Sequence, residues 1–101
     1  MADKRYSILT NNLENCYVCG QRKDHLHEVF YGPYRQTSIK WGLVLPLCYW
    51  CHQGDKGVHN KGYELNRRLK RMTYEKAIEV YGWTDGEWRE KFMKVPEEVT
   101  K

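Results

Sequence analysis

Two Cys-x-x-Cys pairs constrain this chain more than any other feature of its sequence. Cys16 and Cys19 form the first pair, Cys48 and Cys51 form the second, and the sequence has no further cysteine. Four thiolates in two close pairs match the ligand set of one closed, tetrahedral structural zinc ion. The alternatives are two disulfides or free thiols. We therefore predict one structural zinc that ties the two segments together.

The size and composition of the chain favour a bound metal. With 101 residues, 41% of them apolar, it is one small domain near the lower limit at which a hydrophobic core suffices. A bound metal adds stability to such a fold. The first residues are polar, and no stretch approaches the ~20 apolar residues of a membrane span. We expect no signal peptide, no membrane partner and a cytoplasmic location, where paired cysteines favour metal over disulfides.

The order of local patterns predicts an α+β fold with three parts. Residues 1–15 form a polar N-terminal arm, residues 16–60 a zinc-stapled core, and residues 61–95 a helical part of the same domain. Within the core we predict a strand over 25–31, ended by a Gly-Pro pair, and a returning strand over 41–47. Pro46 places that second strand at a sheet edge.

Other segments carry loop and helix signals. Residues 34–40 are polar and basic and are predicted to form a loop, and residues 48–52 to begin a short helix. The C-terminal part is predicted to be helical, with Thr73 capping a second segment that stops at Gly82. A capping box at Thr84 predicts a last helix. We expect all four tryptophans to lie in the core rather than to stack on bases: Trp41, Trp50, Trp83 and Trp88.

The histidines form a set separate from the cysteines. A hairpin followed by a helix can hold one divalent cation between His27 on the first strand and His52 on the helix, because imidazole nitrogens bind such ions. His59 can fold back to the same cation or to a phosphate, since two glycines precede it. The alternatives are an ordinary strand histidine at position 27, a structural zinc ligand at 52 and a capping or solvent residue at 59. His25 has no motif support and is expected at the surface.

The ordered set of motifs resembles the HNH (ββα-metal) endonuclease superfamily in its zinc-stapled form, over about residues 16–60. It resembles in particular a compact prophage-type group, some of whose members are similar to the recombination-enhancing nuclease of a temperate phage. The residues that carry this further resemblance are 26–32, Arg35 and Ser38 in the loop, Gly42-Leu43-Val44, and Gly57-Val58-His59. The resemblance implies a hairpin-helix core, DNA as substrate, a catalytic Mg or Mn ion, and a host-cell cytosol if the chain is phage-encoded.

Three positions depart from the pattern of that superfamily. Two adjacent histidines usually serve as metal ligand and general base, where this chain has His27 and Glu28. Alignment makes His27 the ligand and Glu28 the base. The opposite assignment is chemically as reasonable, because a carboxylate near a cation has a lowered pKa and is a weaker base. Where the superfamily has a central asparagine, this chain has Leu43. The superfamily's last metal-side residue lies one helical turn past Cys51-His52; here that residue is Lys56, and the nearest histidine is His59.

Basic residues are concentrated between positions 60 and 76. This window has six basic and two acidic residues, so that its net charge of +4 equals that of the whole chain. Such a patch is expected of a protein that binds a polyanion, and a solvated helix face is the alternative. The predicted contacts to the DNA backbone are Arg35, Lys40, Arg67, Arg68, Lys70 and Arg71.

Together these features predict an endonuclease that hydrolyses DNA phosphodiester bonds with one divalent cation and an activated water. His27, Glu28 and His52 are the predicted catalytic residues, with His59 completing the cation site. A recombination or packaging protein is a further expected partner. The alternatives are a catalytically inactive zinc-stapled module that binds nucleic acid, and a protein-binding inhibitor or scaffold. The set of His27, Glu28 and His52 distinguishes them, because a scaffold does not need it.

Overall fold

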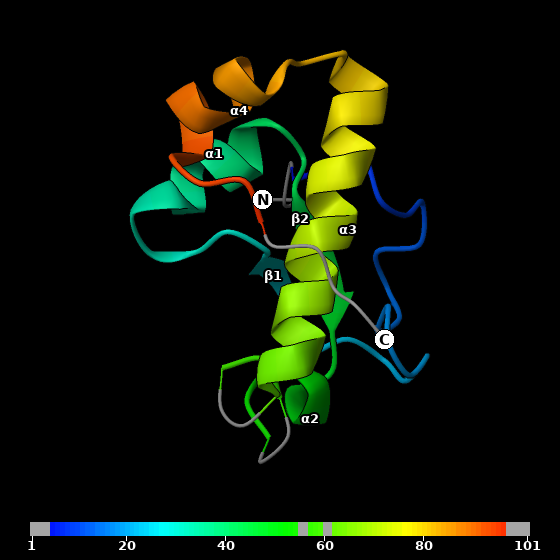
Figure 1. The fold of residues 1–101 in the computed structure, drawn as a ribbon. Coiled ribbons are helices and arrows are strands. Elements are labelled where there is room, and N and C mark those ends of the chain that lie inside the picture. The colour runs from blue at the N-terminus through cyan, green and yellow to red at the C-terminus, as the bar shows by residue number, and fades with distance from the viewer. Residues whose placement is uncertain (1–4, 55–56, 60–61, 97–101) are drawn as a thin grey trace.

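The computed structural model describes residues 5–54, 57–59 and 62–96 of the chain. It confirms the α+β class: a two-stranded antiparallel sheet is combined with helices (Figure 1). Residues 1–4 of the predicted arm and the predicted boundary at 60–61 lie outside the described residues. In chain order the elements are β1 (His25–Glu28), the 3-10 helix η1 (Gly32–Tyr34), α1 (Arg35–Lys40), β2 (Val44–Leu47), α2 (Tyr49–His52), α3 (Tyr63–Tyr81) and α4 (Asp85–Phe92).

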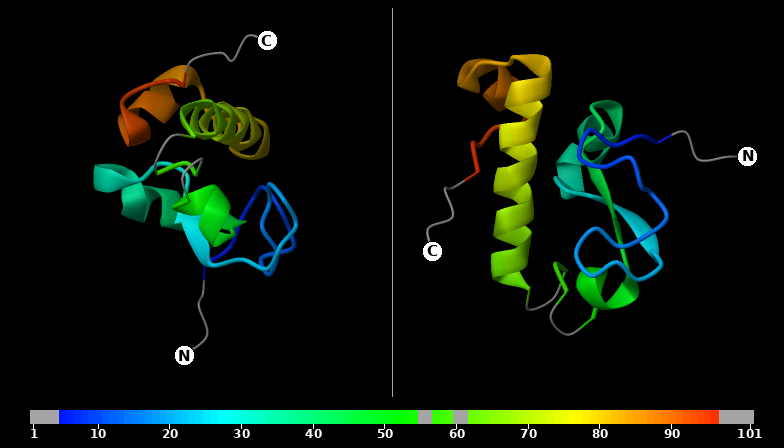
Figure 2. Two further views of the ribbon diagram at one scale, coloured as in Figure 1. Left: turned by 90° about the horizontal axis from the view of Figure 1, so that it is seen from below. Right: turned by 90° about the vertical axis from the view of Figure 1, so that its right-hand side faces the viewer.

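The hairpin lies between two layers. In the antiparallel register, His25 is opposite Leu47 and His27 is opposite Leu45. Helix α3 covers one side of the hairpin and the N-terminal arm lies on the other (Figure 2). All four residues of β2 are therefore buried, which explains why this strand is a continuous apolar run and not an alternating one.

The N-terminal arm is bonded to β2 and to the turn before it. The Ser7 hydroxyl donates a hydrogen bond of 2.7 Å to the carbonyl oxygen of Val44, and the Ile8 N–H donates one of 3.0 Å to that of Gly42. The arm thus satisfies backbone groups of the second strand that the two-stranded sheet leaves without a neighbour.

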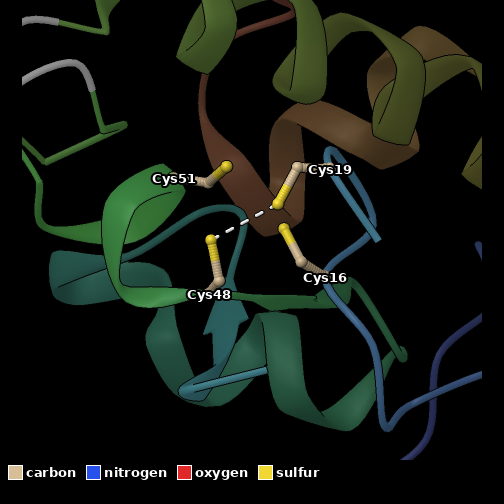
Figure 3. A group of neighbouring side chains, drawn as sticks. All are labelled: Cys16, Cys19, Cys48 and Cys51. Carbon is tan, nitrogen blue, oxygen red and sulfur yellow. Dashed lines mark hydrogen bonds between the residues drawn. The ribbon is translucent and has the colours of Figure 1, made fainter. Parts of the chain in front are cut away.

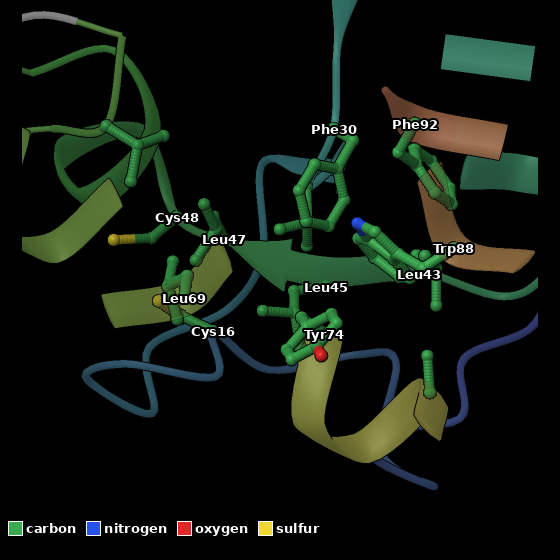
Figure 4. Close-up of a cluster of buried hydrophobic side chains, with 13 residues drawn as sticks. Cys16, Phe30, Leu43, Leu45, Leu47, Cys48, Leu69, Tyr74, Trp88 and Phe92 are labelled. Atoms are coloured by element: carbon green, nitrogen blue, oxygen red, sulfur yellow. The ribbon is translucent and has the colours of Figure 1, made fainter. Parts of the chain in front are cut away.

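One hydrophobic core joins the hairpin to the C-terminal helices (Figure 4). The Trp88 side chain is fully buried. Its ring stacks on Phe92 with centroids 4.4 Å apart and meets Phe30 and Tyr74 edge-on at 5.2 and 5.0 Å. Burial of each such side chain contributes about 1.5–3 kcal/mol. The same core contains residues in or next to the strands together with residues of α3: Val29, Leu43, Leu45, Leu47, Leu69 and Ala77.

The prediction of core positions was wrong for one tryptophan. Trp88 is buried, and Trp41 and Trp83 are half-buried against the core, but Trp50 is 67% exposed. Trp50 lies on the short helix α2, whose buried residue is His52. Residues two apart on a helix point in different directions, so the burial of His52 turns Trp50 toward solvent.

The segment predicted as a loop over 34–40 is helical instead. Pro33 lies in the first turn of η1, where its fixed φ suits a helix. The buried Ser38 hydroxyl then donates a hydrogen bond of 2.6 Å to the carbonyl oxygen of Phe30, which anchors α1 to the hairpin. The second strand also begins later than predicted, at Val44, because Trp41 and Gly42 form the turn that ends α1.

The C-terminal part contains one long helix where two segments were predicted. Thr73 is fully buried inside α3 and does not cap a helix, because the buried face continues from Leu69 to Ala77. The helix does end at Gly82, which has a φ of +69°. Within the described residues, no helix has both the length and the apolar character that crossing a membrane requires.

The predicted capping box of α4 is confirmed. The Glu87 N–H donates a hydrogen bond of 3.1 Å to the Thr84 hydroxyl oxygen, and the Thr84 N–H donates one of 3.1 Å to a carboxylate oxygen of Glu87. This box sets the start of the helix that carries Trp88 and Phe92 into the core.

Replacing Gly42 tests how the turn holds the arm. Gly42 has a φ of +73°, and a Cβ there would run into the Tyr6 ring, whose hydroxyl donates a hydrogen bond of 2.6 Å to the Lys40 carbonyl. We expect Gly42→Ala to lower the free energy of unfolding by the cost of the positive φ, about 1–2 kcal/mol, plus about 1 kcal/mol for the displaced tyrosine. Urea unfolding measures the loss.

Gly82→Ala is the matched control. Gly82 also has a positive φ, but a Cβ there would have open space around it. It therefore isolates the backbone cost, and equal losses in the two variants would contradict a role for Tyr6.

Candidate metal centre

The four cysteines meet in one cluster (Figure 3). Their sulfur atoms all lie within 4.8 Å of one another, and those of Cys19 and Cys48 are 3.5 Å apart. Two sulfurs on a tetrahedral zinc ion are about 3.8 Å apart, given Zn–S bonds of about 2.3 Å. None of the four is in a disulfide. The cluster can therefore hold a structural metal ion such as zinc, as the sequence predicts.

Local backbone structure brings the thiols together. The first pair lies in a tight turn, in which the Gly20 N–H donates a hydrogen bond of 2.9 Å to the Cys16 carbonyl. In the second pair, Cys48 is the N-cap of α2, and Cys51 follows almost one helical turn later. The Tyr17 N–H donates a hydrogen bond of 2.8 Å to the Pro46 carbonyl, which joins the first turn to β2.

The environments of the thiols differ. Burial alone would raise the pKa of Cys16. Hydrogen bonds from backbone groups of Cys48, Cys19 and Val18 lower it by more than burial raises it, so that its pKa falls to about 7. Burial raises the pKa of Cys51. Metal binding requires all four as thiolates, so the ion must displace a proton from Cys51 when it binds.

A second cluster is formed by three histidines. The ligand nitrogens of His27, His52 and His59 lie within 4.8 Å of one another, and their ring centroids are 4.6–5.1 Å apart. Nitrogens that share a metal ion are at most about 4.2 Å apart, given bonds of about 2.0–2.1 Å. Small side-chain rotations would therefore suffice to bind one cation.

Two of these imidazoles carry buried nitrogens that lack a partner. Nε2 of His27 and Nδ1 of His52 have no hydrogen-bond partner among the described residues. An unsatisfied buried polar group costs about 1–3 kcal/mol. A cation bound by the cluster would offset this cost, and in this respect the residues present fit a metal ion.

His59 reaches the cluster because the chain folds back tightly after α2. A Cβ at Gly57 would lie 2.8 Å from the carbonyl carbon and oxygen of His52, so only glycine permits this approach. The His59 N–H then donates a hydrogen bond of 3.0 Å to the same carbonyl oxygen. Lys56, which stands at the usual position of the last ligand, lies outside the described residues.

Burial keeps His27 and His52 neutral. Burial, followed by the charges of His52, His59 and Lys70, lowers the pKa of His27 from 6.5 to about 3. Burial, with the charges of His59 and His25, also lowers the pKa of His52. Neutral imidazoles at physiological pH have the lone pairs that a metal ion requires.

Glu28 is bonded to two arginines. One carboxylate oxygen accepts a hydrogen bond of 2.8 Å from Nε of Arg35, and the other accepts one of 3.1 Å from Nη1 of Arg5. Glu28 belongs to none of the candidate metal clusters in the described part of the chain. Of the two assignments that the sequence left open, this arrangement favours His27 as the ligand.

The histidine cluster and Glu28 line one pocket of about 280 Å³. It also contains Arg35, as well as Arg5, His25 and Tyr31, which sequence reasoning missed. The strand period of two could have revealed His25, since alternate residues of a strand share a face. The His25 side chain is largely exposed, as expected, and its Nδ1 is 2.8 Å from the Asp24 carboxylate. No sequence signal connects Arg5 with this site.

The predicted DNA-binding residues have different surroundings. Arg35 lies at the pocket, Lys40 and Arg67 are exposed, and Lys70 lies 4.7 Å from the centre of the Tyr31 ring. The other two make ion pairs one helical turn along α3, from Arg68 to Glu64 and from Arg71 to Glu75. The Arg68–Glu64 pair is exposed, and such pairs contribute little stability. Arg71 is partly buried and also donates a hydrogen bond to the Pro96 carbonyl.

A scan against protein-family models, a search of curated proteins and a search of solved structures each found no match. The site must therefore be interpreted from its own geometry.

The cysteine cluster predicts the metal content. We expect native mass spectrometry of protein purified under reducing conditions to give one zinc per chain, because the four sulfurs complete its shell. Cys48→Ser should lose the zinc and several kcal/mol of the free energy of unfolding. A metal-free chain whose mass is lower than that of the reduced chain by the four hydrogens lost in two disulfides would contradict this.

The buried His27 predicts a pH dependence of stability. The unfolded chain gains a proton at this residue below about pH 6.5, and the folded protein only near pH 3. Since the unfolded state binds more protons in this window, the free energy of unfolding falls as the pH is lowered from about 6.5 toward 3. This residue contributes up to about 1.4 kcal/mol per pH unit.

Urea unfolding of zinc-loaded protein at several pH values measures this dependence. His27→Gln should remove its share of the slope. His25→Gln, which replaces an exposed imidazole of the same strand, is the control. Equal slopes for the wild-type chain and His27→Gln would contradict the burial argument.

Proposed function

We propose that this protein is a metal-dependent endonuclease of the HNH type that hydrolyses DNA phosphodiester bonds. The observation that carries the proposal is the convergence of three imidazoles in one pocket, two of them with buried nitrogens that lack a partner. The resemblance of the ordered motifs to that superfamily supports it.

The three histidines would hold one divalent cation, Mg or Mn. His27 comes from β1, His52 from α2 and His59 from the turn that follows α2, so the cation site depends on the hairpin and the helix being held together. The cysteine cluster at the end of this unit supplies that support. When bound, the cation stabilises negative charge on the phosphate oxygens and on the leaving oxygen.

The arginines of the pocket are the groups that recognise the phosphate. Guanidinium groups bind phosphate and carboxylate with the same fork of donors. An entering DNA phosphate therefore competes with Glu28 for Arg35 and Arg5. The bonds to Glu28 hold the two guanidinium groups beside the pocket before the substrate arrives.

Glu28 is the base that accepts the proton of the attacking water. With His27 engaged as a ligand, Glu28 occupies the position that the superfamily gives to the base. In the structure, two guanidinium groups occupy the oxygens of this carboxylate. Transfer of the arginines to the substrate phosphate would free those oxygens to accept the proton of the water.

A specific observation favours a second candidate, a module that binds nucleic acid without cutting it. Glu28 is paired with two arginines, and the superfamily's asparagine position is Leu43. If Glu28 stays paired when DNA is bound, no base remains at that position. This candidate predicts salt-sensitive DNA binding without metal-dependent cleavage.

Cleavage of supercoiled DNA tests the proposal. Zinc-loaded protein should nick it only when Mg or Mn is added. His27→Ala and Glu28→Gln should each lower the rate by about a hundredfold or more, because each removes a group from the reaction. Zinc content should be unchanged in both variants.

Glu90→Gln is the control for Glu28→Gln, since it changes the same charge at an exposed position of α4. Cleavage without added divalent metal, or full activity in His27→Ala, would contradict the proposal.

A further inference from the structure

A second cavity, of about 330 Å³, adjoins the metal pocket. We call it the aromatic pocket, and define it by the rings of Phe30, Tyr31, Tyr34 and Phe92 together with Lys70 and the segment 93–96. Tyr31 lines both cavities. Its ring centroid is 4.8 Å from that of His59, so a ligand that extends from one cavity into the other would pass along this tyrosine.

A strained turn forms the rim of the aromatic pocket. Met93 has a φ of +64° and a ψ of −46°, and the Lys94 N–H donates a hydrogen bond of 2.7 Å to the Phe92 carbonyl. This is a three-residue γ-turn of the rare form with positive φ, which is costly for a residue with a side chain. The Met93 side chain is 71% exposed, so its own burial does not offset that cost.

Two side chains hold the segment after the turn in place. The Trp88 indole N–H donates a hydrogen bond of 2.7 Å to the Lys94 carbonyl, and Arg71 donates one of 2.8 Å to the Pro96 carbonyl. The wall of the cavity is therefore fixed to α3 and α4. Strain maintained in this way at the edge of a cavity is typical of a binding site.

The charge of the lining is one-sided. Among the described residues around the cavity, Lys70 and Lys94 are basic and none is acidic. Nζ of Lys70 lies 4.7 Å from the centre of the Tyr31 ring and 5.9 Å from that of Phe30. A ligand that suits this lining has a flat ring to pack against the aromatic side chains and a negative charge near the lysines. A nucleotide has both.

We infer that the aromatic pocket binds one unpaired nucleotide of the DNA strand whose phosphate lies at the histidine cluster. The inference rests on the proposed function and names its substrate class: DNA with unpaired bases, as in a single strand, a flap or a junction. The cavity is at the small end of the range for ligand sites, about 300–1,000 Å³, and has room for one base with its sugar. A base in a duplex enters only after it leaves its partner and the stack.

Methyl NMR of methionine tests where the nucleotide binds. The chain has three methionines. Met93 is at the rim of the cavity. Met72 is on α3 and does not line the cavity; its sulfur accepts a hydrogen bond from the Tyr17 hydroxyl. Zinc-loaded protein is titrated with a short oligothymidylate without Mg or Mn, so that nothing is cleaved. The Met93 signal should shift and that of Met72 should not. Binding that leaves Met93 unchanged, or no binding, would overturn the inference.

Variants in the pocket test its specificity. Tyr34→Leu removes a ring but keeps an apolar side chain, and should weaken oligothymidylate binding about tenfold while leaving the affinity for a blunt duplex unchanged. Tyr63→Leu, at an exposed tyrosine outside the cavity, is its control. Lys94→Gln should also weaken binding, whereas Lys76→Gln, outside the cavity, should not. Equal effects of the pocket and control variants would overturn the inference.

Cleavage separates this inference from the proposed function. If flapped and duplex DNA are both cut with Mg, at equal rates that Tyr34→Leu does not change, the nuclease proposal stands and the pocket inference fails. If oligothymidylate shifts Met93 and binds less tightly to Tyr34→Leu, but no DNA is cut, the pocket binds a nucleotide and the nuclease proposal fails.

Discussion

The two cysteine pairs form one cluster where the turn at Cys16–Gly20 packs against the end of β2 and the start of α2. The geometry of the histidine site depends on this contact, because it joins the elements that carry His27 and His52. A two-stranded hairpin has little stability alone, and α2 is only four residues long. A shared metal ion would hold the two together. The ring centroids of His27 on β1 and His52 on α2 are 5.1 Å apart. Loss of the cysteine cluster would therefore disturb the histidine site although the two share no residue.

Burial explains why two imidazoles of the histidine cluster, those of His27 and His52, are neutral at physiological pH, because it lowers their pKa values. Arg5 and Arg35 beside Glu28 add positive charge to the same pocket. The pocket thus combines imidazoles that could hold a cation with guanidinium groups that could hold an anion. The phosphodiester hydrolysis that we propose would use both.

The sequence predicted those parts of the structure that depend on local spacing. The cysteine pairs, the two strands and the capping box at Thr84 could be predicted because the pattern of each is contained within a few residues. The sequence also suggested that His59 folds back, since glycines precede it. It could not predict that Arg5 and Arg35 hold Glu28, because Arg5 is far from Glu28 in sequence. The helix at 35–40 and the exposure of Trp50 were missed for a related reason: each depends on what the rest of the fold buries. The aromatic pocket likewise combines residues from the segment after the first strand, from α3, and from the end of α4 and the residues after it.

We propose that the three histidines bind a cation separately from the four cysteines. Electron paramagnetic resonance of zinc-loaded protein titrated with Mn²⁺ tests it most directly, because nitrogen couplings identify imidazole ligands. We expect one bound Mn²⁺ with imidazole coordination, which is lost in His27→Ala while the zinc remains. A zinc-loaded protein that binds no Mn²⁺, or binds it equally well in His27→Ala, would show that the histidines do not form a separate cation site.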